Sequence, residues 1–246
     1  MAKGFSLDDL WNSASPGDRA FQPDIISSLP EPARRYLEHA IAPGTQLSSA
    51  VRLRMHGEIK RWLPFTAEQV IVRDRGFIWS ATVRMNGMPI RGFDRLVDGE
   101  GSMRWRLFGI IPVMTASGPD ITRSAAGRVA GEAVWLPSAL CDSSVSWTAT
   151  DSSRLHAKFT TDGHESDLEC RIDDRGRIES LKMQRWGNPD GRGFRHIDFG
   201  CFAENEGTFN GYTIPTRLRV GWYFDTPRFE TEGEFFRCTI DSAEFR

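Results

Sequence analysis

An arginine, a glutamate and a tryptophan are spaced so that they lie together on one side of a predicted helix. Arg128, Glu132 and Trp135 are four and three residues apart within residues 119–141, PDITRSAAGRVAGEAVWLPSALC, and residues at these spacings are neighbours on a helix surface. A charged pair next to a tryptophan at the rim of a core is typical of the polar end of a ligand pocket. The same residues also fit a structural ion pair beside a core tryptophan, so both interpretations stay open here.

The pocket interpretation leads to two functional hypotheses. In the first, the protein binds a small apolar or amphipathic molecule, with its polar end near Arg128 and Glu132 and its body against Trp135, Trp79 and Trp105. In the second, the protein is a cofactor-free enzyme in which Glu132 is the acid or base and Arg128 holds an anionic substrate. The enzyme hypothesis requires a perturbed carboxyl pKa. A closed bidentate pair without a path to solvent would exclude it.

A structural or interaction protein is the third possibility. Its sign would be an exposed apolar patch on the outer face of the sheet. The predicted outer positions are rich in arginine and aspartate, which argues against such a patch.

Aromatic residues are abundant, with eight tryptophans and sixteen phenylalanines. Aromatic side chains suit the half-buried surface of a strand, so we expect most of them to be ordinary core residues. Trp79 and Trp105 lie in predicted strands, and we assign them to the wall of the pocket beside Trp135.

Motifs for other chemistry are absent from the sequence. Neither the five histidines nor the four scattered cysteines have metal-ligand spacing, and there is no nucleophile elbow or phosphate-binding glycine loop. Asp94, Asp98 and Glu100 are close in sequence, but without a ligand-rich loop we interpret them as solvated turn residues. The sequence therefore predicts no metal and no cofactor.

The helix that carries the charged pair has clear limits. Pro119 fits a first-turn position, and Pro137 is expected to end or kink the helix near Trp135. Alanines and glycines, among them Gly127 and Gly131, leave a smooth surface that another backbone can approach closely.

Outside this helix and two N-terminal helices, apolar and polar residues alternate as in strands. Asn86-Gly87, Asp162-Gly163 and Asn210-Gly211 are among the hairpin-type turn signals that separate the strands. We predict a mainly β (α+β) fold: a strongly curved antiparallel sheet, or half-barrel, of about ten to twelve strands that wraps a central helix at residues 119–136. We expect one domain, 1–246, with a helical segment 1–45 packed on the sheet and the curved sheet at 46–246.

Charge and composition restrict the choice of partners. The formal net charge is −2, so nucleic acid is not an expected partner. The sequence has no signal-like or membrane-spanning apolar run, which predicts a cytoplasmic protein without membrane insertion. Reduced cysteines fit the same compartment. The sequence does not predict an oligomeric state.

Several short runs resemble an uncharacterised bacterial protein family, a domain of unknown function, from Leu29 to the C-terminus. The runs that carry the resemblance are Leu29-Pro-Glu-Pro with Arg35-Tyr-Leu, Trp62-Leu-Pro-Phe-Thr-Ala-Glu-Gln, Gly76-Phe-Ile-Trp-Ser-Ala, Asp94 with Gly99-Glu-Gly-Ser-Met103, Ile111-Pro-Val, Arg128 with Glu132-Ala-Val-Trp-Leu-Pro137, Ile214-Pro215 and Trp222. The resemblance implies no activity. The fold that it implies is similar to the half-barrel of lipoprotein carriers and other lipid-binding proteins.

Overall fold

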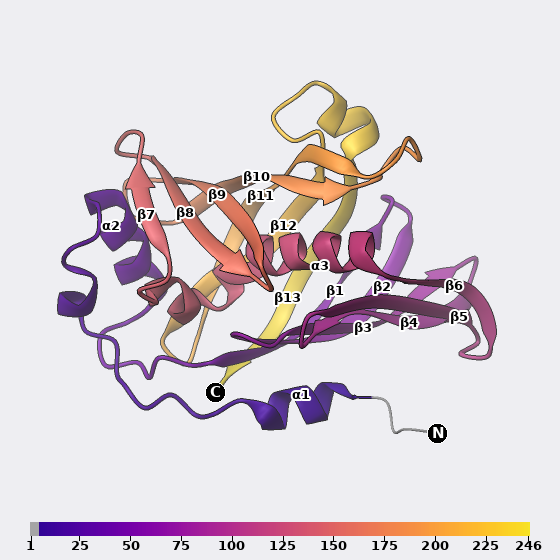
Figure 1. Cartoon of the computed structure of the whole chain (residues 1–246), viewed down its shortest axis with the longest axis horizontal. Helices are drawn as coiled ribbons and strands as arrows, with labels where there is room; N and C mark the ends of the chain where they lie inside the picture. The colour runs from indigo at the N-terminus through magenta and orange to yellow at the C-terminus, as the bar shows by residue number, and fades with distance from the viewer. Residues whose placement is uncertain (1–4) are drawn as a thin grey trace.

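A single antiparallel sheet of thirteen strands dominates the computed structural model, which describes residues 5–246 (Figure 1). The strand order is β6-β5-β4-β3-β2-β1-β13-β12-β11-β10-β9-β8-β7. The sheet thus has two meandering arms, β1–β6 and β7–β13, which join where β1 pairs with β13. The bounds are β1 (Ala50–Ile59), β2 (Leu63–Val72), β3 (Gly76–Met85), β4 (Met88–Val97), β5 (Glu100–Leu107), β6 (Ile111–Ser117), β7 (Ser146–Ala149), β8 (Arg154–Thr161), β9 (His164–Ile172), β10 (Ile178–Gly187), β11 (Arg195–Phe209), β12 (Tyr212–Trp222) and β13 (Glu234–Phe245).

The mainly β, curved antiparallel fold expected from the sequence is confirmed, but the strand count of ten to twelve was too low. The short run Ile111–Ser117, which contains a proline, is the edge strand β6. The predicted hairpin turns are present. In Asn86-Gly87, Asp162-Gly163 and Asn210-Gly211 both residues have positive φ, as a two-residue turn between twisted strands requires.

The helices occupy three different places. α1 (Leu7–Ser13), which begins with a capping box between Ser6 and Asp9, packs Leu10 on the outer face of the sheet, while α2 (Glu31–Ala40) joins the main core. Shorter helical turns are η1 (Pro23–Ile26), η2 (Ala133–Trp135), η3 (Pro137–Cys141) and the π-helical η4 (Phe229–Gly233). None of the helices in the described part of the chain has both the length and the apolar character that crossing a membrane requires.

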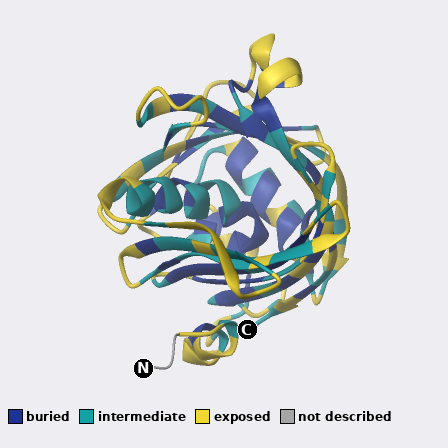
Figure 2. Cartoon of the chain, turned by 90° about the vertical axis from the view of Figure 1, so that its right-hand side faces the viewer, coloured by how far each residue is buried: buried dark blue, intermediate teal, exposed yellow. Residues whose placement is uncertain are grey.

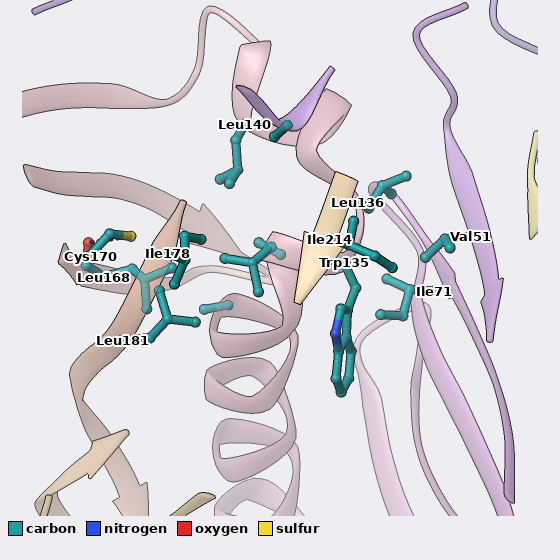
Figure 3. Packing of buried hydrophobic residues seen from close by; sticks show 14 of the residues in the cluster. Val51, Ile71, Trp135, Leu136, Leu140, Leu168, Cys170, Ile178, Leu181 and Ile214 are labelled. Atoms are coloured by element: carbon teal, nitrogen blue, oxygen red, sulfur yellow. Dashed lines mark hydrogen bonds between the residues drawn. The ribbon is translucent and has the colours of Figure 1, made fainter. Parts of the chain in front are cut away.

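The third α-helix, α3 (Pro119–Glu132), lies between the two arms of the sheet. It contacts β3–β6 on one side and β8–β10 on the other, and Figure 2 shows it inside the curve of the sheet. Pro137 limits the helical segment as expected, but α3 ends at Glu132 and continues as η2, so the predicted end at residue 136 was slightly too late. The side chains of Leu168, Leu181 and Ile71 in Figure 3 flank this segment from both arms.

Small residues let α3 approach the sheet, as the sequence indicated, but the contacts differ along the helix. At Gly101 of β5 an added Cβ would lie 2.5 Å from Cα of Thr122, so here two backbones are in close contact. At Gly127 the neighbour is a side chain, with Cγ of Arg185 3.0 Å from an added Cβ. Gly131 has more room, with Sδ of Met183 3.7 Å away. The space beside Gly131 belongs to the cavity described next.

A candidate ligand cavity beside the central helix

A cavity of about 330 Å³ lies between the C-terminal part of α3 and the concave face of the sheet, a volume in the lower range of small-molecule sites. All five residues predicted from the sequence line it: Arg128, Glu132, Trp135, Trp79 and Trp105. Most of the other lining residues are apolar and come from β1, β5, β6, η2 and β9–β13: Ile59, Met103, Met114, Val134, Leu168, Leu181, Met183, Phe199, Cys201, Leu218, Val220, Phe235 and Phe236.

Arg128 is the centre of a charged network on one wall of the cavity. Its Nε donates to Oε1 of Glu132 at 2.7 Å and its Nη1 donates to Oδ2 of Asp94 at 3.3 Å. The guanidinium carbon lies 4.6 Å from the ring centroid of Phe77 and 5.1 Å from that of Trp79. The two carboxylates and the two aromatic rings hold this cation in one orientation.

Both carboxylate oxygens of Glu132 accept hydrogen bonds. Besides the bond from Arg128, Oε2 accepts from Nε2 of Gln69 at 2.5 Å. Gln69 is fully buried in β2, and its Oε1 lies 3.5 Å from Nη2 of Arg128. The pair expected from the sequence is thus one side of a four-residue network rather than an isolated bidentate pair.

The interpretation of Asp94 as a solvated turn residue was wrong. Asp94 lies inside β4, with its side chain 25% exposed, and its Oδ1 accepts a hydrogen bond from the indole Nε1 of Trp105 at 2.9 Å. Burial raises the pKa of Asp94 above its ordinary value, although Arg128, the Trp105 indole and Arg185 act in the opposite direction. Asp98, in contrast, is an exposed turn residue paired with Arg75, as expected.

The raised pKa of Asp94 leads to a pH-dependent prediction. Because folding raises this pKa, the folded chain holds the proton more tightly than the unfolded chain, so Asp94 favours folding below its ordinary pKa of 3.8 and loses this contribution as the pH rises through the raised value. The free energy of unfolding of the native protein, relative to Asp94→Asn, should therefore fall as the pH rises from about 3 to about 7. Urea denaturation of both proteins across this range measures the difference.

Asp98 provides the matched control for this prediction. Arg75 holds the pKa of Asp98 below its ordinary value, so the native protein should gain stability relative to Asp98→Asn as the pH rises. If the two differences change in the same direction with pH, the assignment of opposite pKa shifts is wrong.

A second arginine on the cavity wall was not identified from the sequence. Arg185 extends from β10 across α3 at Gly127, and its Nε and Nη2 donate to the backbone carbonyl of Ser124 at 3.2 and 3.1 Å. Its guanidinium carbon lies 4.5 Å from the ring centroid of Phe199 and 5.2 Å from that of Trp222. Among the residues that the structure describes, no carboxylate forms an ion pair with Arg185.

The three predicted tryptophans differ in exposure and hydrogen bonding. Trp135 is 4% exposed, and its Nε1 donates to the backbone carbonyl of Pro215 at 3.0 Å. Trp105 is half-buried and donates to Asp94. Trp79 is 3% exposed and packs its ring 5.6 Å from that of Trp105, while its buried indole N–H has no acceptor within the described residues. Trp135 is therefore an anchor of the core as well as a wall of the cavity.

The cavity reaches the surface at the edge strand β6. Met114 lines the cavity and is 52% exposed. Four further exposed large apolar side chains lie next to it, on β6 and the turn that precedes it, namely Phe108, Ile110, Ile111 and Val113. This apolar strip, defined as these four residues with Met114, lies along an edge of the sheet rather than on its outer face.

No group of three or more histidine, cysteine, aspartate or glutamate residues suited to a metal ion is found within residues 5–246. Of the four cysteines, Cys201 lines the cavity, and burial raises the pKa of its thiol to about 12. All four are unpaired. A thiol with so high a pKa is protonated at neutral pH and is a poor nucleophile.

Comparison with known proteins assigns the family and leaves the activity open. A model of a family of unknown function, DUF6544, matches residues 19–232. The chain belongs to this family, in agreement with the resemblance seen in the sequence. No curated protein matches the chain. Among solved structures, a LolA superfamily protein from Nitrosomonas europaea matches with 10% sequence identity and a TM-score of 0.47, over 87% of this chain and 92% of that chain.

Proposed function

We propose that this member of the DUF6544 family binds a small apolar or amphipathic molecule in the cavity between α3 and the sheet. The observation that carries the proposal is that Arg128, Glu132, Trp135, Trp79 and Trp105 line one cavity whose remaining walls are mostly apolar. An apolar enclosure with a few polar groups on one side is typical of small-molecule sites. A ligand would place its body against the tryptophans and its polar end toward the charged network.

The apolar strip at β6 supports the proposal, because it offers a route by which such a ligand enters. Met114 belongs both to the cavity wall and to the exposed strip. Apolar side chains therefore continue from the cavity wall at Met114 to the exposed residues Ile111 and Val113. Exposed apolar side chains that gather in one place usually have a role in binding.

Binding of an uncharged fluorescent probe, N-phenyl-1-naphthylamine, tests the proposal, together with a variant that fills the cavity. Gly131 lines the cavity on α3, and the nearest side-chain atom is 3.7 Å from an added Cβ. In Gly131→Leu the new side chain extends into the cavity, and leucine is also the better helix former. We expect the native protein to bind the probe with enhanced fluorescence. Gly131→Leu should bind it at least about 10-fold more weakly, because the leucine side chain takes up space that the probe needs, and the apolar burial that the probe then loses costs over about 1 kcal/mol.

Gly131→Ala is the matched control. One methyl group fits the space at Gly131, so this variant should bind the probe nearly as well as the native protein and be slightly more stable, by up to about 1 kcal/mol. Equal probe binding by Gly131→Leu and the native protein would place the probe elsewhere, for example on the apolar strip. That result, or no binding to the native protein, would contradict the proposal. Native mass spectrometry of the purified protein checks for a retained ligand.

The alternative function, a cofactor-free enzyme that uses Glu132 and Arg128, has less support. Both oxygens of Glu132 already accept hydrogen bonds, from Arg128 and Gln69. A general base needs an oxygen that reaches a substrate proton, so Glu132 would have to leave one of these partners. Ligand binding without catalysis requires no change in the hydrogen bonds of Glu132 and therefore fits the structure better.

A further inference from the structure

We infer that the bound molecule carries an anionic headgroup, a carboxylate or a phosphate, and that Arg185 rather than Arg128 binds it. This inference rests on the proposed function, because it names the chemical class of the ligand in the same cavity. The sequence placed the polar end of a ligand at Arg128 and Glu132. The hydrogen bonds of the two arginines indicate that, among the described residues, Arg185 has the free donor for a ligand.

Arg128 has little capacity left for a ligand. Its Nε, Nη1 and Nη2 face Glu132, Asp94 and Gln69 respectively, and the two carboxylates compensate its charge. A second anion at this position would come close to both carboxylates. Like charges at short distance repel each other strongly where water is excluded.

Arg185 is in the opposite situation. It lines the cavity, and its hydrogen bonds go to one uncharged acceptor, the carbonyl of Ser124, through Nε and Nη2. Nη1 has no hydrogen-bond acceptor among the described residues. A guanidinium presents five N–H donors in a planar fork that matches a carboxylate or a phosphate. The fork of Arg185 is thus partly unused at the cavity wall.

The surroundings of Arg185 fix the guanidinium in place before a ligand arrives. The ring centroids of Phe199 and Trp222 lie 4.5 and 5.2 Å from the guanidinium carbon. The aliphatic part of the Arg185 side chain crosses α3 at Gly127, which has no side chain to block it. A cation that is already oriented loses little conformational freedom when it binds an anion. Gly127 and the two aromatic rings are therefore part of the proposed anion site.

The electrostatics of the cavity agree with this assignment. Burial, together with the nearby charge of Arg128, lowers the pKa of Arg185 to about 10, although the charges of Glu132 and Asp94 act in the opposite direction. The guanidinium therefore stays charged at neutral pH. A buried charge without a direct counterion is costly. Glu132 and Asp94 act on Arg185 only from a distance, and an anionic headgroup would supply the directly bonded counterion that it lacks within the described chain.

Competition between ligands of equal chain length tests the inference. Decanoate, decyl phosphate, decanol and decylammonium are each used to displace N-phenyl-1-naphthylamine from the native protein. We expect one or both anions to bind about 10- to 100-fold more tightly than decanol, the range for a charge-assisted hydrogen bond, and decylammonium to bind most weakly. The comparison of decanoate with decyl phosphate distinguishes the two headgroups.

Variants of the arginine complete the test. In Arg185→Gln the preference for anions over decanol should disappear while the uncharged probe still binds, and Arg185→Lys should retain part of the preference. The matched control is Arg95→Gln, because Arg95 bonds Ser102 and lies near the Phe93 ring, 5.3 Å from its centroid, without lining the cavity. This control should keep the full preference.

The outcomes separate this inference from the proposed function. If the probe binds in a manner that Gly131→Leu abolishes, but decanol competes as well as both anions, the anion site is refuted and the cavity proposal stands. The same conclusion follows if Arg185→Gln keeps the preference for anions. If neither the probe nor any of the four decyl compounds binds the native protein, the proposed function fails and the inference fails with it.

Discussion

Replacing Arg128 with methionine is expected to lower the free energy of unfolding by about 3 kcal/mol, the lower end of the cost of removing one partner from a buried ion pair, because the network is largely but not fully buried. The side chains of Arg128, Asp94 and Glu132 are 17%, 25% and 14% exposed, so water screens the remaining charges poorly. Without the guanidinium, the two carboxylates share one wall of the cavity with no direct cation. The cation–aromatic contacts with Phe77 and Trp79 are lost as well. Urea denaturation monitored by circular dichroism measures the effect.

Three further variants show whether charge or volume causes the loss. Methionine keeps most of the apolar stem of Arg128, so the expected effect comes mainly from charge. The triple variant Asp94→Asn, Arg128→Met, Glu132→Gln removes the uncompensated carboxylates and should recover a large part of the stability. Arg75→Met, which breaks the exposed pair with Asp98, is the surface control and should cost at most about 1 kcal/mol. Equal losses in Arg128→Met and Arg75→Met would show that the network contributes no more than a surface ion pair.

The helix spacing that placed Arg128, Glu132 and Trp135 together is a local property, and local properties could be predicted from the sequence. A separation of three or four residues brings side chains onto one helix face whatever the rest of the chain does. Hairpin turns such as Asn86-Gly87 are local in the same sense, because the two residues themselves must tolerate positive φ. The predicted hairpin turns are present for this reason, whereas the number of strands was underestimated.

The partners of Arg128 could not be predicted in the same way. Gln69 and Asp94 come from two different strands, and their approach to α3 depends on how the whole sheet curves. Asp94 is close in sequence to Asp98 and no ligand-rich loop surrounds them, so the sequence alone favours a solvated turn for both residues. The curvature brings the strand face of Asp94 toward the helix instead. These contacts therefore depend on tertiary packing and not on local sequence preference.

A signal for these residues does exist in the alternation of the strands. Gln69 is in phase with the buried Phe65 and Ile71 on β2, and Arg185 is in phase with the buried Leu181 and Met183 on β10. Polar residues in the apolar phase of a strand must face the core, where each needs a partner. Such out-of-pattern residues are therefore candidates for buried networks or ligand contacts.

Trp135→Ala is expected to destabilise the protein by about 3–5 kcal/mol, the typical cost of truncating a buried tryptophan. Trp135 joins η2 to β12 through the hydrogen bond to the carbonyl of Pro215, and it packs near Ile214 (Figure 3). Truncation enlarges the cavity and leaves that carbonyl without its donor. Trp62→Ala is the control: Trp62 is 59% exposed, so its loss should change stability by only about 0.5 kcal/mol.

Chemical rescue distinguishes an enlarged cavity from a collapsed one. If the walls around Trp135 hold their positions in Trp135→Ala, added indole should occupy the space of the missing ring and raise the Tm of this variant, while the Tm of Trp62→Ala should not change. A rigid cavity binds an apolar molecule in this way because its lining lacks contacts on one side. A loss close to that of Trp62→Ala, with no response to indole, would show that the sheet closes over the vacated space. A site that closes so easily would not hold the preformed cavity on which ligand binding here depends.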